Sequence, residues 1–423
     1  MRIAMVSEHA SPLAVIGGVD AGGQNVHVAE LSAALGRRGH HVVVYTRRDD
    51  PTLPDRVVFA PGVEVVHVAA GPALPLPKDL LYPHMDALAR GLASQWRAEP
   101  PDVVHGHFWM SGVAALQAVR LAQTPDRRPP VVQTFHALGT VKRRHQGPAD
   151  TSPPERAMLE PRLAREVDRI IATCPDEVRE LRAMGARPRR ISVAPCGVDL
   201  GHFRAEGPSE PTGGRRRIAV VGRLVARKGI DLVIAALHEL AAEGIGDVDL
   251  HIIGGSSVAA GLEADPEAGR LAREAVELGV ADQVIFRGQL PREEMPQVLR
   301  SCAAVVCAPW YEPFGIVPLE AMACGIPVVV SAVGGLQDSV VDGVTGLHFR
   351  PRDHRALAAA IRRILDDPSL ATRMGRAGRH RVEKHYSWNT VAELTEQAYL
   401  SCVAQLGARR ANAPLTALLA VEP

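Results

Sequence analysis

Residues 304–330 read AVVCAPWYEPFGIVPLEAMACGIPVVV. The β-branched run 304–307 is followed by turn residues rich in proline and glycine, and Pro318 suits the first turn of a helix, where a backbone N–H is not needed. The helix should stop at Gly325, because glycine is typical of helix C-termini. A second β-branched run begins at Val328. The segment therefore predicts a strand, a turn, a helix and a strand, which is the repeating unit of a parallel sheet.

The same alternation of short β-branched runs and helical patterns extends along the whole chain. We expect strands at residues 3–6, 42–45, 63–68, 103–104, 131–134, 170–172 and 191–193, and then at 218–221, 250–253, 284–286, 304–307, 328–330 and 347–349. These strands are too many for one simple doubly wound sheet. They indicate an α/β protein with two such sheets.

The stretch 206–214 reads EGPSEPTGG and shows no hydrophobic periodicity, which is typical of a linker between domains. We expect two Rossmann-like domains, residues 1–206 and residues 207–384, that face each other across a cleft. A helix over residues 385–408 should cross back and pack on the first domain. Residues 409–423 have weak patterning and are predicted to form a mobile tail.

Composition excludes several classes of function. The 423 residues include 48 basic and 47 acidic side chains, and a net charge of +1 gives no global field for binding nucleic acid. No apolar run is long enough to span a membrane. The six cysteines form no CxxC pair and no leader is evident at the N-terminus, so we expect a cytoplasmic protein. Peripheral membrane contact through basic clusters at 141–145 and 187–190, and a homodimer, stay open.

Two segments have the pattern of a phosphate site. The loop 8–24 contains the glycine pairs 17–18 and 22–23 ahead of a helix, although the spacing is not that of a dehydrogenase. The amides of residues 315–317 should begin a second helix that could bind a diphosphate. Glu312 and Glu320 flank those amides, and a carboxylate suits vicinal hydroxyls because each of its two oxygens accepts hydrogen bonds.

Histidines follow two strands of the first domain. His136 stands at the carboxyl end of its strand, where it could be a base, a ligand contact or a buried core group. His105 and His107 alternate in a way that also fits zinc, but no clustered cysteine or acid accompanies them. We therefore expect no metal site.

The chain resembles the family-4 glycosyltransferases, which have the two-domain GT-B fold. Glu312 and Glu320 give the E-x7-E motif of that family, and residues 222–229, GRLVARKG, match its G-R-L-x-x-x-K-G segment. The glycine pair 334–335 and residues 342–346, DGVTG, match two further segments. The resemblance implies a retaining, metal-independent transfer of a sugar from a nucleoside diphosphate donor.

The resemblance also implies roles for individual residues. The second domain should bind the nucleotide sugar, with Arg223 and Lys228 as cations at the diphosphate and Glu320 on the ribose. In the family, the backbone carbonyl of a histidine at position 136 lies near the anomeric carbon. The expected catalytic residues are His136, Arg223, Lys228 and Glu312. The expected donor-binding residues are Gly23, Arg223, Lys228, Glu312, Phe314, Gly315, Ile316, Val317 and Glu320.

The first domain is expected to bind the acceptor. Its sequence is most similar to the branch containing D-inositol 3-phosphate glycosyltransferase and sucrose-phosphate synthase. The expected acceptor-binding residues are Asn25, Lys78, Phe108, His136 and Arg156. At Phe108 and Ala137 the chain lacks the tyrosine and threonine of the inositol-phosphate enzymes. Two lost hydroxyl donors could each weaken phosphate binding by about 1 kcal/mol, so an acceptor without a phosphate stays open.

The sequence thus predicts a hexosyltransferase that moves a glucose or N-acetylglucosamine type sugar from a UDP-sugar to a hydroxyl of a small polar acceptor, such as a sugar or cyclitol phosphate. No covalent cofactor is expected. The alternatives are a nucleotide-sugar epimerase, a phosphorylase or a non-catalytic nucleotide-sugar-binding module. A phosphorylase would need a pyridoxal-bearing lysine, and Lys384 is the only late lysine.

Overall fold

The computed structural model describes residues 1–14, 22–124, 127–255 and 265–411. The glycine pair 17–18 and residues 412–423 of the expected tail lie outside the described residues. The chain divides into two compact units. The first comprises residues 1–172, residues 178–194 and the chain from residue 392 onward, and the second comprises residues 173–177 and 195–391.

The boundary between the units lies between Ala194 and Pro195, ahead of the expected boundary at residue 206. The physical reason is packing. Val198 and Phe203 are buried in the same hydrophobic cluster as Tyr386, which belongs to the second unit. Residues that precede the linker stretch are thereby fixed to the second unit.

The first unit alternates strands and helices. Its strands are β1 (Arg2–Val6), β2 (His41–Arg47), β3 (Arg56–Ala60), β4 (Val63–Val68), β5 (Val103–His107), β6 (Val131–Thr134), β7 (Arg169–Ala172) and β8 (Ile191–Val193). Its helices are α1 (Gly23–Arg37), α2 (Met85–Ala98), α3 (Trp109–Ala122), α4 (Gly139–Gln146), α5 (Arg156–Glu166) and α6 (Pro175–Ala183), with 3-10 turns η1 (Lys78–Leu80), η2 (Tyr82–His84), η3 (Gly147–Ala149) and η4 (Pro188–Arg190).

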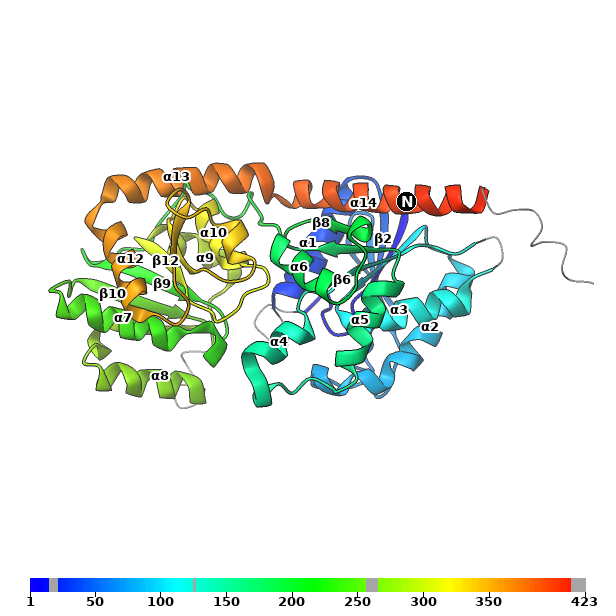
Figure 1. The fold of residues 1–423 in the computed structure, drawn as a ribbon, viewed down its shortest axis with the longest axis horizontal. Helices are drawn as coiled ribbons and strands as arrows, with labels where there is room; N and C mark the ends of the chain where they lie inside the picture. The colour runs from blue at the N-terminus through cyan, green and yellow to red at the C-terminus, as the bar shows by residue number, and fades with distance from the viewer. Residues whose placement is uncertain (15–21, 125–126, 256–264, 412–423) are drawn as a thin grey trace, which may run out of the picture. The chain divides into compact units, whose positions relative to one another are not determined.

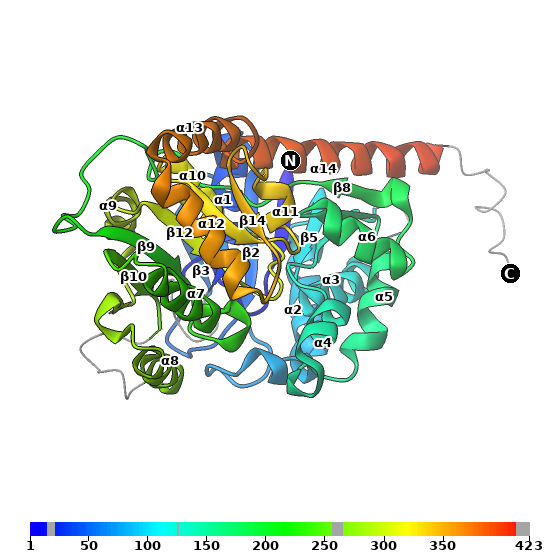
Figure 2. The ribbon, with the colours of Figure 1, turned by 60° about the vertical axis from the view of Figure 1, so that its left-hand side comes forward.

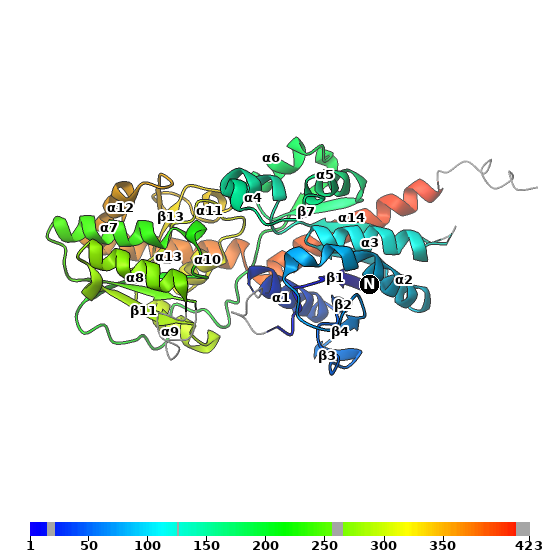
Figure 3. The ribbon, with the colours of Figure 1, turned by 90° about the horizontal axis from the view of Figure 1, so that it is seen from below.

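The strands of the first unit form one eight-stranded sheet in the order β3-β4-β2-β1-β5-β6-β7-β8. The edge strand β3 alone is antiparallel to its neighbour β4 (Figure 3). Strand β3 is not among the strands expected from the sequence. Pro61 and Gly62 join it to β4, and Gly62 has a positive φ of 74°. This tight turn explains how a short strand pairs back on the sheet without a crossover helix.

Helices cover the first sheet because their apolar side chains repeat at helical spacing. In α2, for example, the buried residues are Met85, Leu88, Ala89, Leu92, Ala93 and Trp96. This spacing makes one apolar stripe that packs on the sheet, while the other positions stay polar. Figure 2 shows α2, α3 and α5 beside the strands of this unit.

The second unit repeats the plan with a six-stranded parallel sheet in the order β11-β10-β9-β12-β13-β14. Its strands are β9 (Arg216–Val221), β10 (Val248–Ile253), β11 (Val284–Gly288), β12 (Ala304–Cys307), β13 (Val328–Ser331) and β14 (Gly346–Phe349). Its helices are α7 (Ile230–Ala242), α8 (Pro266–Glu277), α9 (Met295–Arg300), α10 (Ile316–Ala323), α11 (Leu336–Ser339), α12 (His354–Asp366) and α13 (Pro368–His385), with 3-10 turns η5 (Ala226–Lys228), η8 (Ala281–Gln283) and η9 (Arg292–Glu294).

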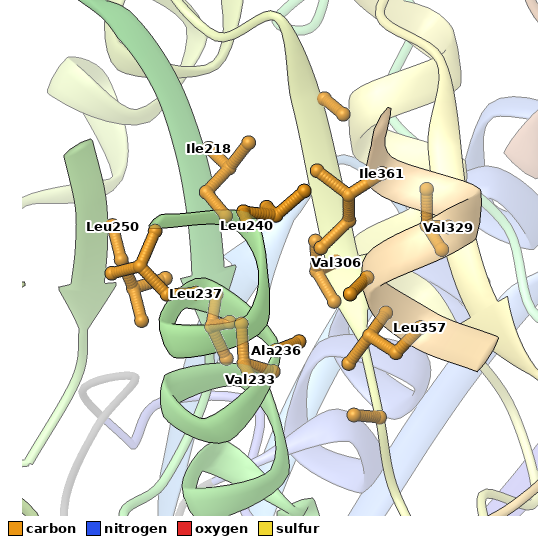
Figure 4. Packing of buried hydrophobic residues seen from close by; sticks show 14 of the residues in the cluster. Ile218, Val233, Ala236, Leu237, Leu240, Leu250, Val306, Val329, Leu357 and Ile361 are labelled. Carbon is orange, nitrogen blue, oxygen red and sulfur yellow. The ribbon is translucent and has the colours of Figure 1, made fainter. Parts of the chain in front are cut away.

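Both faces of the second sheet are buried, because successive strand residues point to opposite sides. Val329 packs with Leu237 of α7 and Ile361 of α12 in one cluster (Figure 4). Its neighbours Val328 and Val330 pack in another cluster with residues of α9, α10 and α13. A sheet covered on both faces explains why the strands read as continuous β-branched runs.

In each sheet the strand order reverses next to the first strand. The reversal lies between β1 and β5 in the first unit and between β9 and β12 in the second. In open α/β sheets, ligands bind outside the carboxyl ends of the strands at this point. The segments that follow β1, β5, β9 and β12 are therefore where a site should be sought.

The last helix, α14 (Trp388–Ala411), follows α13 directly along the chain (Figure 1). From residue 392 it belongs to the first unit. There Glu396 accepts hydrogen bonds from Arg38 and His40, and the hydroxyl of Tyr399 lies 2.7 Å from Nδ1 of His105. Helix α14 is thus held on the first unit by buried and half-buried polar contacts.

All six cysteines are free thiols, and five of them are buried. Burial raises the pKa of each thiol, to about 12 for Cys307. Thiols in such surroundings behave as small apolar side chains.

Candidate active site

Two glycines shape the segment that follows β9. Gly229 begins α7 with a φ of 64°, and a Cβ there would lie 2.1 Å from the carbonyl oxygen of Ala308, just after β12. Gly222 has a φ of 148°, and a Cβ there would meet the side chain of Lys228. The absence of a side chain at Gly229 lets η5 lie directly against the end of β12. The backbone N–H of Trp310 donates to the carbonyl of Arg227 across this contact, at 2.9 Å.

This close approach places Lys228 on Glu312. The Lys228 ammonium donates to Oε2 of Glu312 at 2.6 Å, and Arg227 lies 3.9 Å from the same oxygen. Burial alone would raise the pKa of Glu312, but the charges of Lys228 and Arg227 outweigh it and hold that pKa below its usual value. Glu312 is therefore ionised at neutral pH and remains an acceptor for hydroxyl hydrogens.

The glycine pair Gly334 and Gly335 holds the loop that carries Glu312. The N–H of Gly335 donates to the carbonyl of Glu312 at 2.9 Å. A Cβ on Gly334 would lie 2.3 Å from that carbonyl oxygen, and a Cβ on Gly335 would lie 2.4 Å from the carbonyl oxygen of Pro313. The loop is thus fixed through its backbone by residues that have no side chain.

Helix α10 begins immediately after this loop. Gly315 caps it with a φ of 75°, and a Cβ there would lie 2.7 Å from Leu336. The first N–H groups of a helix have no partner within the helix, so those of Ile316 and Val317 are available to an anion. The N–H of Phe314, which the sequence analysis assigned to the donor, already donates to the carboxylate of Glu312.

Glu320 lies in α10 as the fifth residue of that helix, whereas Glu312 lies in the loop that precedes it. Desolvation raises its pKa to about 7, although Arg292 of η9 pulls in the opposite direction. The thiol of Cys307 at the end of β12 lies in the electrostatic field of Lys228, Glu312 and Glu320 together. The two carboxylates therefore act on the same region of the second unit. Arg223 lies in the exposed turn after β9.

Four histidines gather at the carboxyl ends of β5 and β6 in the first unit. His136 follows β6 with a φ of 62°, which is strained for a residue other than glycine. Its Nε2 lies 2.9 Å from Nδ1 of His107, and the ring of His27 from α1 meets it edge-on. His105 lies beside His107, with ring centroids 4.1 Å apart.

These histidines are uncharged at neutral pH. Desolvation lowers the pKa of His27 to about 4 and that of His105 to about 3. The pKa values of His107 and His136 are lowered well below the ordinary value, first by burial and then by the neighbouring imidazoles. Both nitrogens of His105 are engaged by the protein, through Tyr399 and Thr134, so that ring is a structural group and not a zinc ligand.

Arg156 is almost fully buried and lies over the ring of Phe108, 4.9 Å from its centroid. Its guanidinium donates to Glu160 at 2.7 Å, to Ser152 at 3.3 Å and to the carbonyl of Ala137 at 2.7 Å. A guanidinium has five N–H donors. In the described part of the chain these contacts use three of them, which leaves two N–H groups for a further anionic ligand.

The remaining first-unit candidates lie on other elements. Gly23 begins α1, and Lys78 begins η1. Asn25 is buried, and its side chain accepts from the N–H of Gly22 at 3.0 Å and donates to the carbonyl of Ser11 at 3.1 Å. Asn25 thus shapes the start of α1 in addition to any contact that it makes with a ligand.

Comparison with known proteins identifies the family. Residues 21–202 match the sequence model described as Glycosyltransferase Family 4, and residues 205–381 match the one described as Glycosyl transferases group 1. D-inositol 3-phosphate glycosyltransferase of Geodermatophilus obscurus is 37% identical over 96% of this chain and 91% of its own length. The chain belongs to glycosyltransferase family 4.

Further relatives of this glycosyltransferase support the same family. The enzyme of the same name from Acidothermus cellulolyticus is 37% identical over 92% of this chain and 88% of its own length. The solved sucrose-phosphate synthase from Thermosynechococcus elongatus shares 32% identity and superposes with a TM-score of 0.85, covering 96% of this chain and 99% of the other. The two doubly wound units are the GT-B fold, and the expected branch of the family is confirmed.

The glycosyltransferase therefore carries its candidate residues in two groups. Lys228, Glu312 and the start of α10 adjoin one another in the second unit, and Glu320 shares their electrostatic field. Phe108 and Arg156 contact each other in the first unit. The role of each residue in binding or catalysis stays a prediction.

Sequence reasoning missed a polar network beside Phe108. Glu8 is buried after β1, accepts from Nδ1 of His9 at 2.8 Å and is hydrogen-bonded to the hydroxyl of Ser111, which also accepts from the N–H of Glu8 at 3.0 Å. The ring of His9 meets that of Phe108 edge-on, 5.1 Å between centroids. An acid next to a histidine at the end of the first strand was the available signal.

The basic clusters of the glycosyltransferase are largely engaged by the protein itself. Lys142 pairs with Asp150 at 2.9 Å, Arg144 pairs with Glu180 at 2.6 Å, and Arg190 donates to two backbone carbonyls. Within the described ranges, no helix combines the length and the apolar character needed to cross a bilayer. Lys384, which a phosphorylase would require in its site, is exposed in the last turn of α13.

Proposed function

We propose that this glycosyltransferase moves a hexosyl group from a UDP-sugar to a hydroxyl of a small polar acceptor, with retention of configuration. The observation that carries the donor side is the Lys228–Glu312 pair beside the start of α10. It supplies a cation and free helix N–H groups for a diphosphate, next to a carboxylate for sugar hydroxyls. Solved Anabaena HepE, which has the same fold at 19% identity, is complexed with UDP and with UDP-glucose.

In this proposal the leaving diphosphate is stabilised by Lys228 and Arg223. Preorganised charges of this kind lower a barrier by about 3–4 kcal/mol each. Glu312 binds the hydroxyls of the sugar, and Glu320 binds those of the ribose. The leaving phosphate oxygen takes the proton of the acceptor on the same face, so retention needs no protein nucleophile. Such a mechanism differs from that of a retaining glycosidase, which needs a carboxylate pair.

The acceptor is proposed to be a cyclitol or sugar phosphate bound by the first unit. Two N–H groups of Arg156 are available for it within the described contacts, and Lys78 lies on the same unit. Relatives at 37% identity are named for D-inositol 3-phosphate. Phe108 and Ala137 bring no hydroxyl to the site, so binding of the phosphate rests on fewer donors. We propose the cytoplasm as the compartment, since a reducing environment keeps the six thiols free.

Substitution of the donor residues tests the proposal. We expect Lys228→Ala to lower kcat about 10²- to 10³-fold, the effect of removing one oxyanion-stabilising donor. Glu320→Ala should weaken UDP-glucose binding about 10-fold or more, since it removes hydrogen bonds to a charged group. Both variants are assayed for sugar transfer and for donor hydrolysis. Lys384→Ala is the matched control, because that lysine is exposed on α13. Near-wild-type transfer by both Lys228→Ala and Glu320→Ala would contradict the proposed donor-binding site.

Acceptor identity is tested separately by mass spectrometry of the product. UDP-glucose and UDP-N-acetylglucosamine are each offered with D-inositol 3-phosphate, glucose 6-phosphate and the two unphosphorylated parents. We expect transfer to a phosphorylated acceptor, reduced about 10-fold or more by Arg156→Ala. Equal transfer to phosphorylated and unphosphorylated acceptors would contradict the phosphate part of the proposal and leave the donor part standing.

A further inference from the structure

The segment 150–152, which follows η3 and precedes α5, is anchored on α4. The ammonium of Lys142 in α4 lies 2.9 Å from Oδ1 of Asp150 and donates to the hydroxyl of Ser152 at 2.9 Å. The N–H of Ser152 donates to the same Oδ1 at 3.0 Å. Burial would raise the pKa of Asp150, but the hydrogen bonds from Lys142 and Ser152 lower it to about 2. The carboxylate is therefore ionised at neutral pH, and its pairing holds the segment on α4.

Ser152 connects this anchor to Arg156. Its hydroxyl oxygen also accepts from Nη1 of Arg156 at 3.3 Å. Pro153 and Pro154 follow, and each proline ring fixes its own φ. The N–H of Arg156 donates to the carbonyl of Pro153 at 3.1 Å. The chain between Ser152 and Arg156 is therefore short and stiff, and the guanidinium is held by Ser152 as well as by Glu160.

Thr151 ties the same segment to η1. Its hydroxyl donates to Oδ2 of Asp79 at 2.6 Å. Asp79 is the neighbour of Lys78 in a 3-10 turn of three residues, and none of these three residues is buried. Packing in the hydrophobic core therefore does not fix the position of η1. The Thr151–Asp79 hydrogen bond joins η1 to the segment that also holds Arg156.

We propose that residues 150–152 are positioning residues that set the separation of Lys78 and Arg156, and that they thereby favour a phosphorylated acceptor. This inference rests on the proposed function, in which both cations bind the phosphate of the acceptor. A phosphate group presents three acceptor oxygens, so two cations act on it together only when their spacing matches. Side chains that bind a ligand need supporting contacts of this kind to hold their geometry. An acceptor without a phosphate has no need of that spacing.

The rest of the acceptor region makes the placement of Arg156 more important. Phe108 and Ala137 bring no hydroxyl to the phosphate, so its binding depends on few donors. A guanidinium is planar and its five N–H groups have fixed directions. The contacts to Ser152, Glu160 and the carbonyl of Ala137 therefore also fix the directions of the two N–H groups that these contacts leave for a ligand.

Two variants of Thr151 separate the hydrogen bond from packing. Thr151→Val removes the hydroxyl and keeps the shape of the side chain, whereas Thr151→Ser keeps the hydroxyl. With D-inositol 3-phosphate or glucose 6-phosphate as acceptor, we expect Thr151→Val to raise the acceptor KM about 3- to 10-fold, the scale of one hydrogen bond. The kcat and the donor KM should stay within about twofold of the wild type, and Thr151→Ser should restore the acceptor KM.

The unphosphorylated acceptors inositol and glucose separate phosphate selection from a general loss of fit. We expect kcat/KM for these acceptors to stay within about twofold of the wild type in Thr151→Val. Thr372→Val is the matched control, because the hydroxyl of that exposed threonine donates to the carbonyl of Pro368 in α13. An unchanged acceptor KM in Thr151→Val, or an equal loss with phosphorylated and unphosphorylated acceptors, would overturn the inference.

Hydrogen exchange measures the hold on η1 without any turnover. The N–H groups of Leu80 and Leu81 donate to the carbonyls of Pro77 and Lys78. We expect both to exchange about 3- to 10-fold faster in Thr151→Val, since local opening becomes easier by one hydrogen bond, and at the wild-type rate in Thr372→Val. Unchanged exchange in Thr151→Val would overturn the inference. If the wild type transfers no sugar to any phosphorylated acceptor, the proposed acceptor fails, while hydrogen exchange still decides whether Thr151 holds η1. An active wild type with unchanged exchange in Thr151→Val fails the inference alone.

Discussion

Glu312 and Glu320 are chemically identical side chains whose pKa values shift in opposite directions. Lys228 and Arg227 lower the pKa of Glu312, whereas desolvation raises that of Glu320 to about 7. The difference follows from position: the loop after β12 faces the cationic turn η5, and α10 offers no comparable cation to Glu320. Environments that separate two carboxyl groups in this way are a mark of functional sites.

The raised pKa of Glu320 makes donor binding depend on pH. If Glu320 accepts hydrogen bonds from the ribose, the ionised form binds, and with a pKa of about 7 its population rises about tenfold between pH 6 and pH 8. We expect the Kd of UDP-glucose, whose phosphates do not titrate in this range, to fall by that factor. Isothermal calorimetry of the wild type and of Glu320→Gln measures it. The same pH dependence in Glu320→Gln would show that another group is responsible.

At the scale of elements, the site is built by backbone segments that touch through glycines. Gly229 lets η5 reach the end of β12, and Gly334 and Gly335 support the Glu312 loop. These contacts join three segments that are far apart in the sequence, residues 227–229, 308–313 and 334–335. The consequence is that the Lys228–Glu312 distance depends on residues that never touch a substrate.

Gly229→Ala tests this dependence. A Cβ at Gly229 would meet the Ala308 carbonyl at 2.1 Å, whereas a Cβ at Gly279, which has a similar φ of 70°, would meet nothing within 4 Å. We expect Gly279→Ala to cost about 1 kcal/mol of unfolding free energy from backbone strain alone. Gly229→Ala should cost several kcal/mol, since overpacking adds about 1–3 kcal/mol, and should weaken donor binding. Urea unfolding and UDP-glucose titration measure both, and equal effects of the two variants would refute the contact argument.

The elements were largely predictable, but their contacts were not. Every β-branched run that we expected to form a strand does so, and the central strands, which are buried on both faces, have the most characteristic composition. Strand β3 was missed, although its sequence RVVFA is also rich in β-branched residues, and two of its five residues are exposed. The Lys228–Glu312 pair joins residues 84 positions apart, and the unit boundary depends on the packing of Val198 and Phe203. The Lys228–Glu312 pair and the unit boundary both depend on contacts between residues that are distant in the sequence, so no local sequence pattern predicts them.

At the scale of the whole molecule, the chain builds two units with separate cores and returns through α14 to the first of them. The first unit therefore depends on residues from both ends of the sequence. Tyr399 is the buried anchor of that return, because its hydroxyl satisfies His105 inside the first sheet. Stability of the first unit should be sensitive to changes near the C-terminus that leave the second unit intact.

Tyr399→Phe tests this coupling. It leaves Nδ1 of the buried His105 without its donor, which should cost about 1–3 kcal/mol. We expect hydrogen exchange to accelerate in β5 and β6 of the first unit and to stay unchanged in β9 and β12. UDP-glucose binding should be unaffected. Leu400→Ala, at an exposed position of the same helix, is the control. Uniform acceleration in both units would contradict the separate cores.

Ligand protection tests the division of labour between the units. A ligand at 100 times its Kd stabilises the species that binds it by about 2.7 kcal/mol. We expect UDP alone to slow hydrogen exchange in η5 and at the start of α10. A phosphorylated acceptor should slow exchange in the segment that follows β6. Protection of the first unit alone by UDP would reverse the assignment of donor and acceptor.

The buried thiols have a practical consequence for spectroscopy. Burial holds each cysteine thiol in its protonated form. We therefore expect maleimide dyes at neutral pH not to react with any of the six native cysteines. A single cysteine introduced at exposed Val276 of α8, and a second at exposed Met158 of α5, would then take a fluorophore pair without prior removal of native cysteines. Energy transfer between the two dyes would follow the separation of α5 and α8 during turnover, in the native sequence background.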